Sequence, residues 1–375
     1  MVPASRFVRM GRVVAVLASF VGSGVSCRQI LGLDEMPPEI APGGSGGSGG
    51  GDAGTGEAGD GGADSPFQLV HAVPSSSGAE DLIAIWGASP DFVMAVGTSA
   101  TSIVVSGGEI TRLGGNEKGR DYLAVWGFAA DDIYAVGQSQ MGNAGFVNHF
   151  DGMTWTTVFE APVPLLGVWG TIEQGKQVVL VTGLQGRLFG WHTQQVWSEL
   201  EQLPAGPHDP DTAEAPVFWS ISGRNAYDFS FVSDGRFWRF EPEGQETIFA
   251  YYDFTTYSDT RFRALWQAPD PPGSVYIGTN FHGLMWFSAG SMTVLSRDES
   301  FAGAAETFTQ SVWGTPEKVI AVGDRGWIFA YDLATSTGAP VASPTDEPLS
   351  SVWASSIDDV WIAGARELIL HGSLK

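Results

Sequence analysis

Short apolar runs alternate with polar turn residues from residue 66 to residue 375, and the alternation itself repeats along the chain. The clearest copies of the repeated unit read LIAIWGASPDFVMAVG (82–97), YLAVWGFAADDIYAVG (122–137), QSVWGTPEKVIAVG (310–323) and SVWASSIDDVWIAG (351–364). Tryptophans spaced 40 to 50 residues apart mark the units: Trp86, Trp126, Trp169, Trp219, Trp266, Trp313 and Trp353. A repeat of this period built from short strands predicts an all-β fold, a seven-bladed β-propeller with four-stranded antiparallel blades.

Each unit holds four strand signals, which the second unit shows most clearly. They are Leu123–Trp126, Ile133–Val136, GFVNHF (145–150) and TWTTVF (154–159), with an Asp-Gly turn between the last two. Both faces of the first two strands are apolar, as expected for blades packed between neighbouring blades. The residues two positions before the tryptophans are mostly small, which suits a crowded inner strand: Ala84, Ala124, Gly167, Val217, Ala264, Ser311 and Ser351. The seven indoles are therefore expected to fill the core between blades.

The seventh unit is one strand short, because the chain ends soon after the strand at Leu368–His371. At the other end, PFQLVHAV (66–73) is a lone strand before the first unit. We expect this N-terminal strand to close the last blade and leave no long exposed edge. Residues 66–375 then divide into about 44 per blade. Unit four (217–240) is the most divergent, because Gly no longer follows Trp219.

The first 26 residues have the pattern of a secretory signal peptide, with three Arg before an apolar stretch that ends in small residues. Cys27, the only Cys in the chain, follows directly and resembles the acylated Cys of a bacterial lipobox, although Gly24 stands where Leu is usual. The alternative is ordinary signal cleavage and a secreted or periplasmic protein with one free thiol. Residues 27–65 are expected to be a lipid-anchor arm followed by a Gly/Ser/Asp-rich tether at 42–65. The tether should be disordered because it lacks apolar residues to bury, and it should span roughly 25–30 Å. Residues 66–375 form the propeller in this division.

Charge and residue usage restrict the chemistry that the chain can carry out. The formal net charge is −23, or −26 without the three Arg of the signal, so no nucleic-acid partner is expected. No Cys/His spacing is typical of a zinc site, and HDPDTAE (208–214) lacks the third Asp/Asn and the Gly of an EF-type calcium loop. No metal, cofactor or catalytic residue is therefore assigned. His149 and His371 fall at the same third-strand position of units two and seven, which favours a structural role.

Asp151-Gly152-Met153-Thr154-Trp155 resembles in part the Asp box of sialidase-type propellers, although the residue between Asp and Gly is missing. In that family the box is a structural turn away from the active site. The sialidase Arg triad and Tyr/Glu pair match no positions of this sequence, so the resemblance does not extend to that activity.

The longest connections between units are 200–216, 243–261 and 296–308. Residues Thr247–Tyr252 within the second are favoured as the fourth strand of unit four, so the better candidates for a partner-binding surface lie beyond them. These are Phe254 and Tyr257, beside Asp253 and Asp259. We predict that the three connections lie on one face of the ring and form the main interaction surface.

Taken together, the VWG…DDVWAVG units resemble those of bacterial surface lipoproteins whose repeats form propellers distantly similar to the Asp-box type. The resemblance covers about 310 residues and all seven units. It implies a non-catalytic recognition or scaffolding module, held at the outer membrane or cell surface by the lipid on Cys27, with a protein or glycan ligand on the loop face. The alternative is a glycan- or polysaccharide-active enzyme with carboxylates at the channel mouth.

Overall fold

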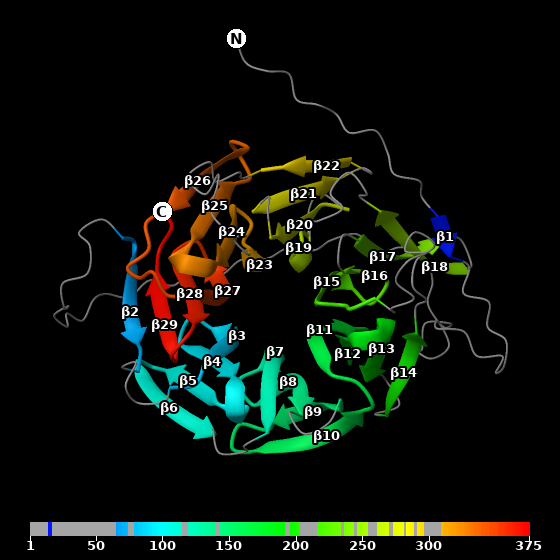
Figure 1. Ribbon diagram of the computed structural model, residues 1–375, viewed down its shortest axis with the longest axis horizontal. Coiled ribbons are helices and arrows are strands. Elements are labelled where there is room, and N and C mark those ends of the chain that lie inside the picture. The colour runs from blue at the N-terminus through cyan, green and yellow to red at the C-terminus, as the bar shows by residue number, and fades with distance from the viewer. Residues whose placement is uncertain are drawn as a thin grey trace, which may run out of the picture.

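Seven four-stranded antiparallel sheets stand around a central axis in the computed structural model, so the chain is a seven-bladed β-propeller (Figure 1). The prediction of the fold class is confirmed. The structure describes the short strand at 14–16 and residues 65–73, 79–114, 119–139, 143–191, 196–202, 216–233, 236–243, 246–253, 261–269, 273–280, 283–288, 291–295 and 309–375.

Blades 1 to 4 follow the chain in order, each with its first strand innermost. Blade 1 consists of β3 (Leu82–Ser89), β4 (Phe92–Gly97), β5 (Ser102–Ser106) and β6 (Glu109–Gly114). Blade 2 consists of β7 (Arg120–Ala129), β8 (Asp132–Ser139), β9 (Gly145–Phe150) and β10 (Trp155–Ala161). Blade 3 consists of β11 (Leu165–Glu173), β12 (Lys176–Gly183), β13 (Arg187–Trp191) and β14 (Trp197–Gln202). Blade 4 consists of β15 (Ser220–Asn225), β16 (Asp228–Ser233), β17 (Arg236–Glu243) and β18 (Glu246–Asp253).

Blades 5 to 7 complete the ring. Blade 5 consists of β19 (Phe262–Gln267), β20 (Val275–Thr279), β21 (Leu284–Ser288) and β22 (Ser291–Val294). Blade 6 consists of β23 (Thr309–Gly314), β24 (Lys318–Gly323), β25 (Ile328–Asp332) and β26 (Thr337–Val341). Blade 7 consists of β27 (Leu349–Ser356), β28 (Asp359–Gly364), β29 (Leu368–Gly372) and β2 (Phe67–His71). Single 3-10 turns join the second and third strands of blades 1, 3 and 6: η2 (Thr98–Ala100), η3 (Leu184–Gly186) and η6 (Asp324–Gly326).

The N-terminal strand β2 closes blade 7, as the sequence predicted. It pairs antiparallel with β29, from Phe67 opposite Gly372 to His71 opposite Ile369. Phe67 is buried in the same core as Leu349 and Ile362 of blade 7. The outer strand of the last blade therefore comes from the opposite end of the propeller segment, and the ring is joined by strand pairing.

Polar contacts reinforce this closure on the side of blade 1. The Glu367 carboxylate, with 4% of its side chain exposed, accepts from the Arg112 guanidinium of blade 1 and lies 3.5 Å from His71 Nε2 of the closing strand. The backbone N–H of Glu367 also donates to Glu80 O, at 2.9 Å. One buried carboxylate thus links blade 7, blade 1 and β2.

The blades pack through a repeated contact in which the indole of one inner strand lies on the glycine of the next. In blades 1, 2, 3, 4 and 6 a Gly of the inner strand leaves room for the Trp of the preceding blade: a Cβ added at Gly127 would lie 2.7 Å from the Trp86 ring. The same contact occurs at five blade interfaces: Trp86 on Gly127, Trp126 on Gly170, Trp169 on Gly223, Trp266 on Gly314 and Trp353 on Gly87. Between blades 6 and 7, Trp313 Nε1 donates to Ala354 O at 2.9 Å.

The short strand β1 (Val14–Val16) pairs antiparallel with β18 and adds a fifth strand to the sheet of blade 4. Among the described residues, no helix has the length and apolar character needed to cross a membrane.

We expect deletion of residues 1–75 to lower the melting temperature by at least about 5 °C or to cause aggregation. Loss of Phe67 alone removes a fully buried aromatic side chain, which costs about 3–5 kcal/mol. Deletion of residues 1–64 is the matched control, since it leaves β2 in place. Equal melting temperatures for the two truncated proteins, measured by calorimetry, would contradict a closing role for β2.

Candidate functional site

The prediction that Trp219 is the repeat Trp of unit four is wrong. Trp219 lies three residues before the position that the repeat Trp occupies in the other blades. In β15, Gly223 lies opposite Phe229, as Gly127 lies opposite Ile133 in blade 2. The Trp169 ring packs on Gly223, so Ser222 occupies the position that Trp has in the other blades. The small residue two positions earlier is consequently Ser220 in place of Val217, and all seven residues at that position are small.

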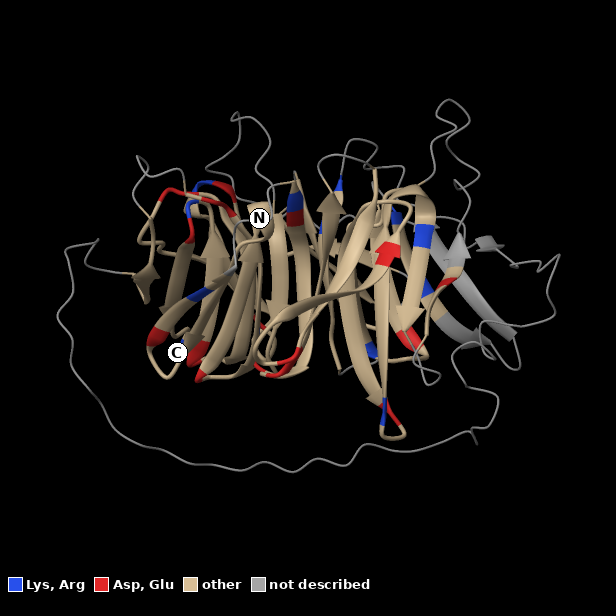
Figure 2. Ribbon diagram, turned by 90° about the horizontal axis from the view of Figure 1, so that it is seen from below, with Lys and Arg blue, Asp and Glu red and all other residues tan. Residues whose placement is uncertain are grey.

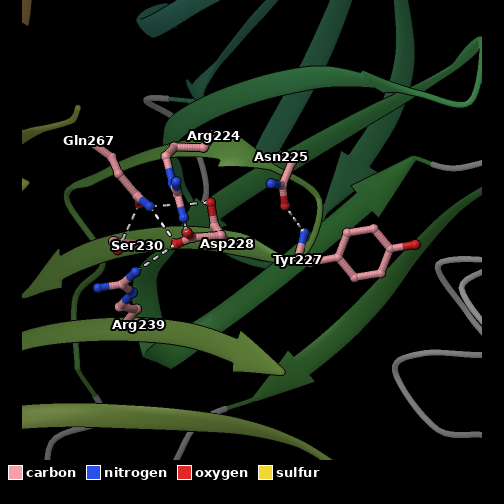
Figure 3. A network of polar contacts seen from close by, with 7 residues as sticks. All are labelled: Arg224, Asn225, Tyr227, Asp228, Ser230, Arg239 and Gln267. Atoms are coloured by element: carbon pink, nitrogen blue, oxygen red, sulfur yellow. Dashed lines mark hydrogen bonds and ion pairs between the residues drawn. The ribbon is translucent and has the colours of Figure 1, made fainter. Parts of the chain in front are cut away.

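The interface between blades 4 and 5 replaces the indole-on-glycine contact with hydrogen bonds, which centre on Asp228 (Figure 3). Ser222 Oγ accepts from the backbone N–H of Gln267, at 3.1 Å, and Gln267 stands where the next blade usually has Gly. The Gln267 side chain accepts from Ser230 Oγ at 2.9 Å, and its amide donates to the Asp228 carboxylate. The Gln267 side chain, which is longer than the usual Gly, therefore fills the space that the missing indole leaves.

Two arginines neutralise this buried carboxylate. Arg224 Nε donates to Asp228 Oδ2 at 2.8 Å, and Arg239 Nη2 donates to Asp228 Oδ1 at 3.1 Å. Figure 3 shows both guanidinium groups pointing at Asp228, whereas the Tyr227 ring points away from the cluster. Asp228 is 8% exposed, so the cluster is a structural ion pair inside the blade interface.

A β-bulge lies near the start of six of the inner strands, three residues before the repeat Trp. The register shifts leave one residue unpaired in each of these strands: Ile83, Leu123, Leu166, Arg263, Gln310 and Ser350. Blade 4 has the same arrangement, because the Trp219 N–H donates at 3.0 Å to Val232 O, and Val232 is the partner of Ser220. Trp219 is thus the seventh member of this set, which we call the bulge ring.

All seven side chains of the bulge ring line the central channel, and all are at least partly exposed. Blades 1 to 4 contribute apolar members, whereas blades 5 to 7 contribute Arg263, Gln310 and Ser350. The Arg263 guanidinium carbon lies 3.7 Å from the centre of the Trp219 ring, a cation–π contact at the border between the two sectors. A bulge turns its extra residue out of the sheet, which is why these side chains face the channel.

The channel is obstructed below the bulge ring by the layer of repeat tryptophans. The rings of Trp126 and Trp313 come from blades 2 and 6, which are not neighbours, yet their centres are 6.3 Å apart. The indoles therefore meet across the axis. The pocket that remains above them encloses about 170 Å³, enough for one benzene-sized group.

Serine hydroxyls extend the polar sector of the pocket. Ser351 Oγ accepts from the backbone N–H of Ile85, and Ser311 Oγ accepts from that of Val352, each at 3.2 Å. A hydroxyl that accepts one hydrogen bond still has its own proton to donate. None of the described residues that line the pocket is Asp or Glu, and Arg263 is the one charged residue among them.

The two faces of the ring differ in their charged residues. The face where the inner strands begin, here called the mouth face, carries Arg120, Arg187, Arg261, Arg263, Arg325 and Arg366 among its described residues. The opposite face holds the turns between first and second strands, with Asp91, Asp131, Glu173, Glu317 and Asp358. In the edge-on view of Figure 2, the turns at the lower edge of the ring are mostly red. Acidic residues such as Asp81, Asp324 and Glu347 also lie on the mouth face, so the arginines are what distinguishes the face onto which the bulge ring opens.

The turn that resembles an Asp box lies on the opposite face and has a structural role. Asp151 Oδ1 accepts from the backbone N–H groups of Thr154 and Met153, at 2.8 and 3.0 Å, and these bonds lower the pKa of Asp151. Blade 6 has a similar turn, where hydrogen bonds from Thr335 and then Lys318 lower the pKa of Asp332 to about 2. Both carboxylates stabilise turns between third and fourth strands.

The two repeat histidines also have a structural role, as expected. His149 Nε2 donates to Asp132 at 2.9 Å, and His371 Nε2 donates to Asp359 at 2.8 Å. Each pair joins the third strand of a blade to the start of its second strand. Burial raises the pKa of Asp359, but the hydrogen bonds from His371 and its neighbours outweigh burial and lower that pKa overall.

Most of the binding residues predicted from the sequence lie outside the described part of the chain. Phe254, Tyr257 and Asp259 do, as do Cys27 and the acidic segment 208–214. Asp253 ends β18, which runs to the mouth face and confirms Thr247–Tyr252 as part of a fourth strand. Among the residues that the structure describes, no group of three or more His, Cys, Asp or Glu side chains is placed to hold a metal ion.

Trp219 was assigned to the repeat position because the units were aligned on tryptophan alone. The second-strand Asp follows the Gly of the inner strand by five positions in both blade 2 (Gly127 to Asp132) and blade 4 (Gly223 to Asp228). Aligning the units on this spacing would have placed Trp219 three residues before the repeat position, which is the position that Arg263 occupies in blade 5.

Comparisons with solved structures agree with the seven-bladed propeller fold. No protein-family model matches the sequence, and neither does any curated protein. Among solved structures, the chain is similar to YCF48 bound to D1 peptide, with a TM-score of 0.59 and 15% identity over 83% of this chain and 97% of that one.

Two further structures show the same likeness. YCF48 from Cyanidioschyzon merolae has a TM-score of 0.59 and 14% identity, over 82% of this chain and 99% of that one. The WD40 β-propeller domain of Doa1 has a TM-score of 0.60 and 14% identity, over 83% of this chain and 98% of that one. At such identities the likeness shows the shared fold.

Replacing Trp169 or Trp219 by Ala distinguishes the two kinds of tryptophan. Trp169 is 4% exposed and fills the interface to blade 4, so Trp169→Ala should reduce the free energy of unfolding by about 3–5 kcal/mol. Trp219→Ala should cost clearly less, because that side chain lies partly open to the channel. Denaturant unfolding measures both free energies. Equal losses of unfolding free energy in the two variants would contradict the prediction and indicate that Trp219 is as important for the core as Trp169.

Proposed function

We propose that this propeller is a non-catalytic recognition and scaffolding module, displayed on the cell envelope by a lipid on Cys27, with its partner bound at the mouth face. The bulge ring is the observation that carries the proposal. It presents partly exposed apolar and hydrogen-bonding side chains around one pocket on the axis of the ring.

The chemistry of the pocket favours binding over hydrolysis. A glycan-active enzyme of the usual kind needs two carboxyl groups beside the scissile bond, one of them with a raised pKa. The described lining of the pocket offers an arginine, an amide and hydroxyls. Such groups recognise a ligand and provide no general acid or base of ordinary kind.

The similar structures support a polypeptide as the partner. One of them is a propeller, YCF48, bound to a D1 peptide. The three long connections predicted as the interaction surface also begin and end on the mouth face, at Gln202 and Pro216, Asp253 and Arg261, and Leu295 and Thr309. Connections and bulge ring would therefore contact one partner together.

Photo-cross-linking on intact cells tests the location of the partner. A photoreactive residue at Gln310, which is exposed on the mouth face, should capture a specific protein. The same photoreactive residue at Met153, which is 84% exposed on the opposite face, is the matched control and should capture no specific protein.

The double variant Phe254→Ala and Tyr257→Ala should weaken the capture at Gln310 while the melting temperature stays nearly unchanged, since surface substitutions cost within about 0.5 kcal/mol. Capture at Met153 alone would contradict the proposed face.

The lipid anchor is supported by the position of Cys27, the only Cys, directly after an apolar stretch. Cys27→Ala should convert a protein that requires detergent for extraction into one released in soluble form. Mass spectrometry of the mature N-terminus provides the direct measurement. Wild-type protein that already partitions into the aqueous phase, with no lipid mass on its first residue, would instead indicate plain secretion.

A further inference from the structure

We infer that the pocket of the bulge ring binds an acidic side chain of the partner, flanked by an apolar residue. This inference rests on the proposed recognition function and names the chemistry of its ligand. It follows from how the seven bulged positions divide into sectors, from the single cation among the described lining residues, and from the depth of the pocket.

The apolar sector is continuous and fixed in place. Leu123, Leu166 and Trp219 come from consecutive blades, and each occupies the bulged position of its inner strand. A partner side chain that leans on these groups buries apolar area, worth about 25 cal/mol per Å². This sector therefore selects an apolar residue.

The remaining sector offers hydrogen-bond donors. Arg263 has the only charge among the described lining residues, and its guanidinium is positioned on the Trp219 ring, 3.7 Å from the centre. The side chains of Gln310 and Ser350 follow at the same position in the next two blades, with the hydroxyls of Ser311 and Ser351 beside them. A group of donors around one cation is matched by an anionic acceptor.

Charge and size identify that acceptor as a carboxylate. The protein has a net charge of −23, so a doubly charged phosphate is repelled more strongly than a singly charged carboxylate. The pocket of about 170 Å³ is closed below by Trp126 and Trp313, so it admits one side chain and no continuing chain. A Glu or Asp reaches into such a pocket from a segment that lies across the mouth face.

Binding of short peptides to the purified propeller tests the inference. The probe is acetyl-Leu-Glu-Leu-amide, and the matched probe has Gln in place of Glu; calorimetry gives both dissociation constants. The Glu peptide should bind about tenfold more tightly or better, since a hydrogen bond to a charged partner contributes about 1.5–3 kcal/mol. Replacing both Leu by Gly should weaken binding severalfold through the apolar sector.

Arg263→Gln should abolish the preference for Glu over Gln. Gln310 already occupies the equivalent position of blade 6, so we expect the fold to accommodate this side chain. Thermal unfolding of the variant should show a melting temperature close to that of the wild type. The control is Arg325→Gln, because Arg325 is exposed in η6 on the same face and Gln185 stands at the equivalent place in η3. This control should keep the preference.

Three results would overturn the inference: equal affinity for the Glu and Gln peptides, a preference that survives Arg263→Gln, and binding only of peptides with a free C-terminal carboxylate. The test separates the inference from the proposed function. If the Glu peptide binds no more tightly than the Gln peptide while Gln310 still cross-links a partner, the mouth face is the interface and the pocket is not its acidic subsite. If nothing is captured at Gln310 while the Glu preference depends on Arg263, the pocket binds carboxylates and the partner proposal fails.

Discussion

The contact between an indole and the glycine of the next blade determines how the blades of this propeller stack. A tryptophan can lie flat against the neighbouring inner strand only where that strand has no Cβ, and Gly127 and Gly223 leave this space for Trp86 and Trp169. Six of the seven blades supply an indole to the next blade, and five blades receive it on a glycine, so the contact links neighbouring blades around most of the ring and favours its closure. The strand β2 serves the same requirement at the seam, where it supplies the outer strand that blade 7 would otherwise lack.

The one interface without an indole shows what the contact contributes. Between blades 4 and 5, Ser222 and Gln267 replace Trp and Gly, and Gln267 reaches the buried Asp228. That carboxylate is tolerable in the interior because Arg224 and Arg239 neutralise it and the amide saturates its remaining acceptor positions. An apolar contact has thus been exchanged for a polar network that demands several partners at once. Trp219 lies at the edge of this interface, where its ring packs against the core of blades 4 and 5 and remains partly exposed to the channel.

The sequence predicted the number of blades, the innermost position of the Trp strand and the closing strand, because each follows from periodicity and from strand count. It predicted the register of blade 4 wrongly, because Trp219 happens to lie near the expected spacing while the residue that specifies packing is Gly223. The bulges were also beyond the sequence pattern. An extra residue in a strand changes which side chains face the axis, and no local composition marks it at Ile83 or Gln310.

The paired and the bulged positions of the inner strands have different roles, and this difference explains why the candidate site lies in the channel. The paired positions pack between blades, and the bulged positions line the pocket. Paired positions of the inner strands are committed to packing: the repeat Trp needs its glycine, and the residue two places earlier must be small. The bulged residue three places earlier is partly exposed to the channel in every blade, and its side chain varies from Ile83 to Arg263. A ring of seven such positions lets side chains of different chemistry converge on one point while the scaffold stays constant. The change from apolar to polar members falls between Trp219 and Arg263, and the proposed recognition function depends on this division, since the fold itself does not require it.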